Sequence, residues 1–136
     1  MNLEPINLWA WGAGDPNYPD GSFYAYGLYA GIDLINSGAV DVNTIGGTLN
    51  VPAGAYTSIS EAGGLYGAGD VDNTGAIAVP AAAGTADAND GSAYAFVADA
   101  YGIYAHGDAN NTGTIVVNVT AGVADTDNGN SAFATC

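Results

Sequence analysis

Pairs of β-branched residues, two positions apart, recur along the chain and alternate with residues of mixed character. The pairs are Val40 with Val42, Ile77 with Val79, and Ile115 with Val117. A spacing of two places both members on one face of a β-strand, whereas a helix would need a spacing of three or four. Glycine falls throughout every stretch, which also disfavours helix. The pattern therefore predicts an all-β chain whose β-branched pairs point into a core.

A second alternating segment precedes each pair and contains Gly, then Leu or Ile, then Tyr. Its copies are Gly27 to Tyr29, Gly64 to Tyr66 and Gly102 to Tyr104. We expect the Leu or Ile to point inward and the tyrosines to line up outside, but the reversed facing satisfies the same alternation. Between the two strands lies Asp-x-x-Asn-Ser/Thr-Gly, whose residue types favour turns. This segment is predicted to be a corner.

The whole phrase returns after 37 residues, from Gly27 to Gly64, and after 38 residues, from Gly64 to Gly102. A fixed period of this length is typical of solenoids, in which stacking of the repeats supplies the core. We therefore predict a parallel β-solenoid (β-helix) of about three repeats over residues 23–136. Residues 1–22 lie outside the repeat and are interpreted as an N-terminal cap or exchange segment. The sequence leaves open whether one repeat makes one coil or two.

If one repeat makes one coil, equivalent corner residues stack about 4.8 Å apart. Asn36, Asn73 and Asn111 would then form a hydrogen-bonded amide ladder. The preceding acids would form a column of carboxylates, and the three residues are Asp33, Asp70 and Asp108. Two carboxylates at this spacing repel by about 0.9 kcal/mol even in water.

No Lys or Arg exists to offset that repulsion. Outward solvation, high salt or a divalent cation with oxygen ligands would do so, and Asp and Asn oxygens suit Ca²⁺. We therefore predict Asp33, Asp70 and Asp108 as a candidate calcium site, with solvated surface turns as the alternative. The turns at 87–90 and 125–128 have a similar density of oxygen atoms and resemble a calcium loop only loosely.

The charge of the chain excludes two classes of partner. Fourteen acidic residues and no Lys or Arg give a formal charge of −14, the opposite of what nucleic acids and anionic membranes attract. The chain contains no apolar run of about 18 residues, so the sequence predicts no membrane span. The N-terminus lacks the basic region of a secretory signal. Nine Tyr, three Phe and two Trp at set positions argue against disorder.

The N-terminal segment carries a strand pattern of its own, from Asn7 to Trp11. Trp9 and Trp11 share a face, and we expect them to be buried under the first coil or against a neighbouring chain. A short solenoid exposes strand edges and core at its ends unless they are capped. We therefore predict that the chain partners with itself, end to end, with Trp9 and Trp11 as candidate self-assembly residues.

Two single residues carry weaker signals. His106 replaces Gly31 and Ala68 of the other copies at a turn, so we interpret it as a surface residue. Cys136 is the only cysteine, so it cannot form an internal disulfide; a bridge between chains and a chance terminal thiol both fit.

The repeat phrase resembles those of secreted autotransporter passengers and large haemagglutinin-like bacterial adhesins. The likeness rests on Gly-Ile-Tyr-Ala at 102–105 with Asn-Thr-Gly-Thr-Ile at 111–115, and on the matching segments of the other two copies. It implies a right-handed parallel β-solenoid that acts as a cell-surface fibre, adhesin or scaffold. The chain departs from those families in lacking a recognisable membrane barrel or secretion domain and in having few repeats.

Three functional classes fit a chain of this kind. We favour an extracellular or cell-surface structural protein that forms filaments. The second class is a carbohydrate-binding or calcium-dependent adhesin, in which the tyrosine column would stack on surface glycans. A polysaccharide-cleaving enzyme is disfavoured, because anionic substrates would be repelled and no Arg or Lys can stabilise a developing oxyanion. We therefore predict no enzymatic activity.

Overall fold

The computed structural model describes residues 6–12, 20–128 and 131–136, with only the backbone described in β1 (except for Leu8) and for residues 20–23. All regular elements of this part of the chain are β-strands. They are β1 (Ile6–Gly12), β2 (Asp20–Ala30), β3 (Leu34–Asn36), β4 (Val40–Gly46), β5 (Thr48–Gly67), β6 (Val71–Asn73), β7 (Ile77–Ala82), β8 (Thr85–Ala105), β9 (Ala109–Asn111), β10 (Ile115–Thr120), β11 (Val123–Thr126) and β12 (Ala132–Thr135). Within the described residues, no helix is long and apolar enough to cross a bilayer.

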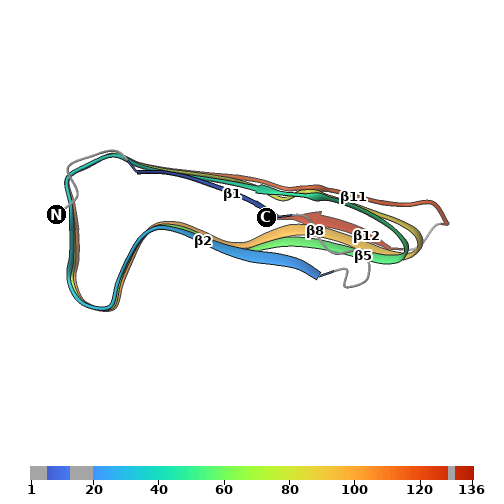
Figure 1. Cartoon of the computed structure of the whole chain (residues 1–136), viewed down its shortest axis with the longest axis horizontal. Helices are drawn as coiled ribbons and strands as arrows, with labels where there is room; N and C mark the ends of the chain where they lie inside the picture. Colours follow the sequence, from blue (N-terminus) through green and yellow to red (C-terminus); the bar gives the residue numbers. More distant parts are fainter. Residues whose placement is uncertain (1–5, 13–19, 129–130) are drawn as a thin grey trace.

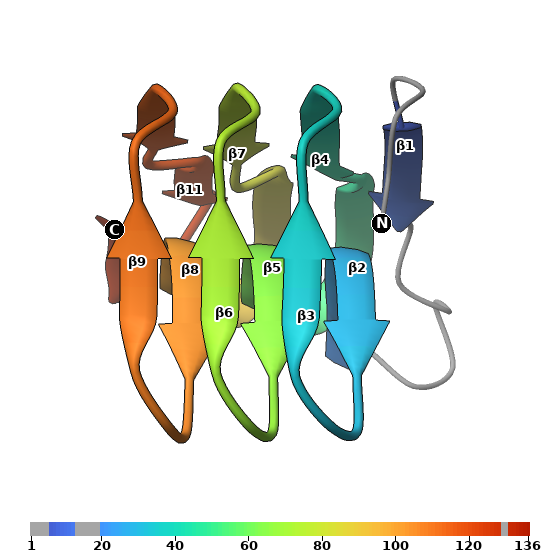
Figure 2. The same cartoon turned by 90° about the vertical axis from the view of Figure 1, so that its left-hand side faces the viewer.

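The strands form three sheets that wind around one axis. Their orders are β1-β4-β7-β10, β11-β8-β5-β2 with β12 also on β8, and β3-β6-β9. All the strand pairs are parallel, as stacked coils require. Figure 1 shows the two long sides of the flattened coil, and Figure 2 shows β3, β6 and β9 side by side across one narrow side. The prediction of an all-β parallel solenoid with about three coils is confirmed.

Each repeat makes one coil. Leu28 pairs with Leu65 and Leu65 with Ile103, so residues 37 or 38 positions apart lie in neighbouring strands. Asn36 pairs in the same way with Asn73 and Asn73 with Asn111. The register decides the question that the sequence left open, because two coils per repeat would have brought different residues together.

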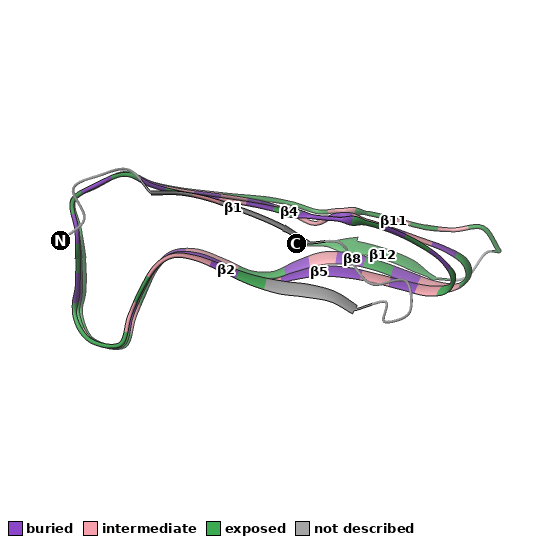
Figure 3. Cartoon of the chain, viewed as in Figure 1, coloured by how far each residue is buried: buried purple, intermediate pink, exposed green. Residues whose placement is uncertain are grey.

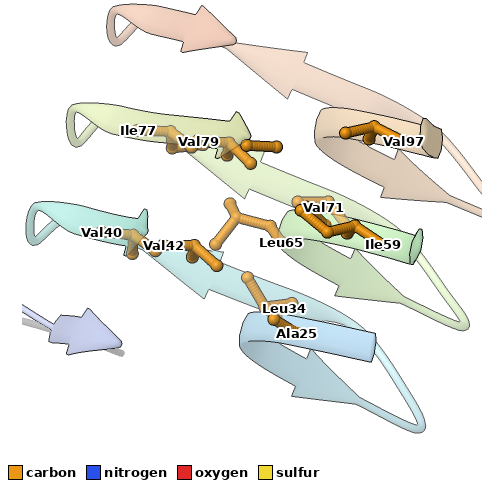
Figure 4. Close-up of a cluster of buried hydrophobic side chains, with 12 residues drawn as sticks. Ala25, Leu34, Val40, Val42, Ile59, Leu65, Val71, Ile77, Val79 and Val97 are labelled. Carbon is orange, nitrogen blue, oxygen red and sulfur yellow. The ribbon is translucent and has the colours of Figure 1, made fainter. Parts of the chain in front are cut away.

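The main core lies between the long sheets. Val40, Val42, Ile77 and Val79 point from one side toward Leu65 and Ile59 on the other (Figure 4), and all six are at most 1 % exposed. Ile115 has the same place in the last coil but is 37 % exposed, because no coil of the described structure lies above it. The predicted inward facing of the β-branched pairs and of Leu65 is therefore confirmed.

The far end of the flattened coil is filled mostly by alanine. Its buried cluster consists of Leu49, Val51, Ala55, Ala86, Ala88, Ala93 and Ala95. Small side chains let the two layers converge, and the coil narrows there (Figure 1). The chain reverses at the tip through Gly54 and Gly91, whose φ angles of +53° and +109° are costly for residues with a Cβ.

The N-terminal segment contributes a strand to the solenoid. β1 pairs in parallel with β4 of the same chain, with Ile6 opposite Val40 and Gly12 opposite Gly46. Strand β2 begins at Asp20, so residues 20–22 lie in the first coil rather than before it. The division into a cap or exchange segment and a repeat domain stays a prediction.

Glycine positions show how closely the backbones of neighbouring coils approach each other. A Cβ on Gly75 would collide with the carbonyl oxygen of Gly38 in the coil below, whereas a Cβ on Gly31 would meet nothing within 4 Å. We expect Gly75→Ala to lower the free energy of unfolding by about 1–3 kcal/mol and Gly31→Ala to change it by less than about 0.5 kcal/mol. Urea unfolding of both variants checks this, and equal effects would contradict the register of the corner.

Candidate functional site

The corner columns are built from side chains that bond to their own copies. Asn36 Nδ2 donates to Asn73 Oδ1 at 2.7 Å, and Asn73 Nδ2 donates to Asn111 Oδ1 at 2.6 Å. Each amide also donates to the glycine carbonyl two residues further on, at 2.8 to 2.9 Å. Asn36 and Asn73 are fully buried. The predicted amide ladder is confirmed, and it holds each turn while joining the coils.

The Asp column lies on the surface of the same corner. The backbone N–H of Asp70 donates to Asp33 Oδ1 at 3.0 Å, and the N–H of Asp108 donates to Asp70 Oδ1 at 2.9 Å. Each carboxylate of the lower two coils thus accepts a hydrogen bond from the backbone of the coil above. A group of three or more acidic, His or Cys side chains placed to hold a metal is absent from the described residues. The calcium hypothesis at Asp33, Asp70 and Asp108 stays a prediction.

The predicted outer tyrosine column is confirmed. The rings of Tyr29 and Tyr66 stack with centroids 4.7 Å apart and planes 7° from parallel, and those of Tyr66 and Tyr104 at 5.1 Å and 4°. A sugar would need a free ring face, but here both faces of Tyr66 are covered by its neighbours. Only the outward faces of the two terminal rings are left, so the column suits stacking of coils better than binding of glycans.

A second aromatic column lies near the tip of the coil. Tyr94 stacks on Phe133 at 5.4 Å and 13°, while Tyr56 is tilted by 46° from Tyr94 at 6.1 Å. Phe133 belongs to β12, so this contact helps to hold the last described strand on β8. The rings of this column again come from equivalent positions in successive coils.

A tyrosine–carboxylate clamp departs from the pattern in which each side chain contacts its own copy in the next coil. Tyr26 Oη donates to Glu61 Oε2 and Tyr101 Oη donates to Glu61 Oε1, both at 2.6 Å. The residue between the two tyrosines in the column is Gly63. A Cβ there would lie 2.6 Å from the Tyr101 ring, so the glycine leaves the space that Tyr101 fills.

Sequence reasoning missed this clamp. Its signal is the single glycine in a column that otherwise holds Tyr26 and Tyr101, with a Glu two residues before it. The hydrogen bond to Glu61, then burial and the negative charge, raises the pKa of Tyr26 to about 12. Burial, followed by the same hydrogen bond, raises the pKa of Tyr101.

His106 and Cys136 lie on the surface. His106 Nε2 is 3.1 Å from Tyr66 Oη, and its ring stands edge-on to Tyr66 and Tyr104. The interpretation of His106 as an exposed turn residue is confirmed, although its contact with the tyrosine column was not predicted. Cys136 is exposed and free.

The C-terminal coil is the open end of the described structure. Strands β9 and β10 are the last strands of their sheets, and β11 and β12 flank β8 on its outer side. Figure 3 shows the change from buried positions in the middle coils to exposed ones here. Its exposed large apolar residues are Ile115, Val116, Val119, Val123 and Phe133. Apolar side chains beside unpaired strand edges are typical of a surface that pairs with another strand.

The register places Trp9 opposite Asn43 and Trp11 opposite Ile45. Asn43 and Ile45 belong to β4, and their side chains are at least partly exposed. The side chains of Trp9 and Trp11 lie outside the described residues. Their role in self-assembly stays a prediction.

Comparisons with family models, with curated proteins and with solved structures found no match to this chain. The resemblance to autotransporter passengers and haemagglutinin-like adhesins is therefore still a prediction from the repeat phrase.

The Asp column allows a test that separates repulsion from cation binding. Asp70→Asn keeps an oxygen that accepts the Asp108 N–H but removes one charge from the column. We expect it to raise the free energy of unfolding by up to about 1 kcal/mol at low salt, and the gain to vanish in high salt. Urea unfolding at the two ionic strengths checks this. If calcium holds the column, the substitution will instead lower stability, and a chelator will lower the melting midpoint of the unaltered chain.

The clamp predicts a loss of stability at alkaline pH. Glu61 raises the pKa of Tyr26 from 10.0 to about 12. The contribution of this hydrogen bond to the free energy of unfolding is therefore complete below pH 10 and is lost as the pH rises to about 12. Glu61→Gln removes the charge, so we expect tyrosine ionisation to begin nearer pH 10 and the stability to depend less on pH in that interval. Absorbance titration of tyrosinate, with melting at each pH, measures both. Identical titrations of the two proteins would contradict the clamp.

Proposed function

We propose that this chain is a structural protein that associates end to end with further copies of itself into a filament or cell-surface fibre outside the cell. The observation that carries the proposal is the open C-terminal coil. Within the described residues, strands β9 and β10 have a partner on one side only, and apolar residues flank them. An extracellular location is supported by the likeness of the repeat phrase to surface fibres.

The geometry of the columns supports this function in a second way. In the amide ladder and the tyrosine stack, the middle-coil residues Asn73 and Tyr66 each contact their equivalents in the coil below and in the coil above. An exposed coil in this register is best matched by a strand that continues the register, and a second copy can supply one. Contacts between copies that do not close on themselves produce filaments.

A carbohydrate-binding adhesin is the second candidate, supported by the exposed aromatic residues. Tyr29 and Tyr104 each keep one ring face that no described tyrosine of the column covers. Binding to a glycan array by protein that remains in discrete particles would favour this candidate. The stacked arrangement of the rings favours the filament.

Charge sets the conditions for assembly. Each copy carries −14, so association brings like charges together, and screening shortens their reach from about 10 Å at 0.1 M salt to about 3 Å at 1 M. We expect filament formation to increase with ionic strength, measured by light scattering and negative-stain microscopy. Discrete particles at every salt concentration would overturn the proposal.

A matched pair of variants locates the contact. Val123, at the open end, is 59 % exposed and Ile32, in a corner turn of the first coil, is 76 % exposed. Val123→Glu and Ile32→Glu add the same charge and remove an aliphatic side chain. We expect Val123→Glu to raise the protein concentration needed for assembly more than Ile32→Glu does, with similar melting midpoints.

A further inference from the structure

Two strands stand outside the three-coil stack, one at each end. β1 lies one coil below β4 in its sheet. β12 lies one coil above β8, because residues 93–96 of β8 pair with β12 on one side and with residues 55–58 of β5 on the other. Neither strand has companions at its level in the other sheets of the described structure.

These two strands block a direct continuation of the stack. If the first coil of a second copy lay directly on the last coil of this one, its β4 would pair with β10. Its β1 would then need the place that β10 already holds. Residues 20–22 of its β2 would also collide with residues 133–135 of β12, because both segments align with residues 94–96.

Both collisions disappear when the second copy is moved up by one coil. Its β1 then lies beside β10, and its β2 lies beside β12 of the first copy. β1 and β12 come to the same level from different chains. We propose that the junction between copies is this shared coil, in which β1 of one copy pairs with β10 of the next and β12 fills part of the opposite side. The inference rests on the filament function proposed above.

The backbone of β10 is oriented for this pairing. The N–H of Val40 donates to Ala76 O and that of Ile77 to Thr114 O, both at 2.8 Å, so this position donates toward the coil above. Ile115 has the equivalent position in β10. Its N–H, and by alternation those of Val117 and Val119, therefore point toward the open end, where the described part of the chain supplies no strand.

The side-chain pattern of β1 also continues that of β10. Ile6 and Leu8 align with Val40 and Val42 of the first coil, and Leu8 packs against the main core. On β10 the same strand would align Ile6 with Ile115 and Leu8 with Val117, both apolar. β1 thus repeats the inward positions of the sheet and would cover the last coil in its own register.

Charge favours the shared coil over direct stacking. In a direct continuation, Asp108 of one copy and Asp33 of the next would be one strand spacing apart, about 4.8 Å. In the shared coil they are two spacings apart, about 10 Å, near the screening length at 0.1 M salt. The tyrosine columns of the two copies are separated in the same way, so Tyr104 does not stack on Tyr29 of the next copy.

The axial repeat of the filament distinguishes the shared coil from direct stacking. Four coils per copy give about 19 Å along the axis and three coils give about 14 Å. We expect fibre diffraction or electron cryomicroscopy of filaments of the full chain to show the longer repeat. The shorter repeat would overturn the shared coil and leave the filament function standing, whereas an absence of filaments under every condition would overturn the filament function itself.

A charge exchange tests the strand pair directly. The register aligns Asn7 of β1 with Asp41, Ala78 and Val116 of the successive coils, so Asn7 of one copy would face Val116 of the next. Val116→Glu combined with Asn7→Lys creates an opposite-charge pair across the junction. Val116→Glu combined with Ile32→Lys has the same net charge without that pair.

We expect the first double variant to assemble at a critical concentration about three- to fivefold lower than the second, as for an opposite-charge cross-strand pair. Melting curves of both variants show whether each is folded, since Lys at position 7 also gains Asp41 as a neighbour in its own chain. Equal critical concentrations for two folded variants would overturn the pairing of β1 with β10.

Discussion

The structure depends on one constraint, which is that every coil places a residue directly over its equivalent in the coil below. The backbone bonds between parallel strands fix that spacing, so each side chain must be compatible with its own copy. Asparagine meets this condition because its amide both donates and accepts, and Asn73 does both within the ladder. Tyrosine meets it by ring stacking, and valine by packing. Glycine is required where the carbonyl oxygen of the coil below fills the space, as at Gly75.

Acidic residues are the hardest to stack, and the chain solves the problem in two ways. In the Asp column, the carboxylate of each lower coil accepts the backbone N–H of the next, so the charge gains a partner without a cation. At Glu61, tyrosines from the coils below and above converge on one carboxylate. Both solutions use neutral donors, as they must in a chain without Lys or Arg. The column that holds Tyr26 and Tyr101 has Gly63 in its middle coil, because a tyrosine there would leave no room for the Tyr101 ring.

Much of this could be predicted from the sequence, since a period of 37 or 38 residues fixes which residues stack. The inward pairs at 40–42 and 77–79, the amide ladder and the tyrosine column all follow from that period together with strand alternation. The number of coils per repeat did not follow, because it depends on where the chain turns. The clamp at Glu61 was missed because Glu61 lies in a different column from Tyr26 and Tyr101, and its carboxylate reaches them through side-chain length rather than through repetition. Nor does a repeat say how the coil ends.

The ends matter because a stack of equivalent coils has no internal reason to stop. Val79 in the middle coil is completely buried, whereas Val117, its equivalent in the last coil, is only half-buried for want of a coil above it. Covering that coil recovers about 25 cal/mol for each Å² of apolar surface, while a net charge of −14 on each copy opposes association. Non-repeat strands such as β1 can shift this balance, since they cover apolar core without adding another Asp to the column. In the proposed filament, the sequence outside the repeat, rather than the repeat itself, would then decide how copies meet.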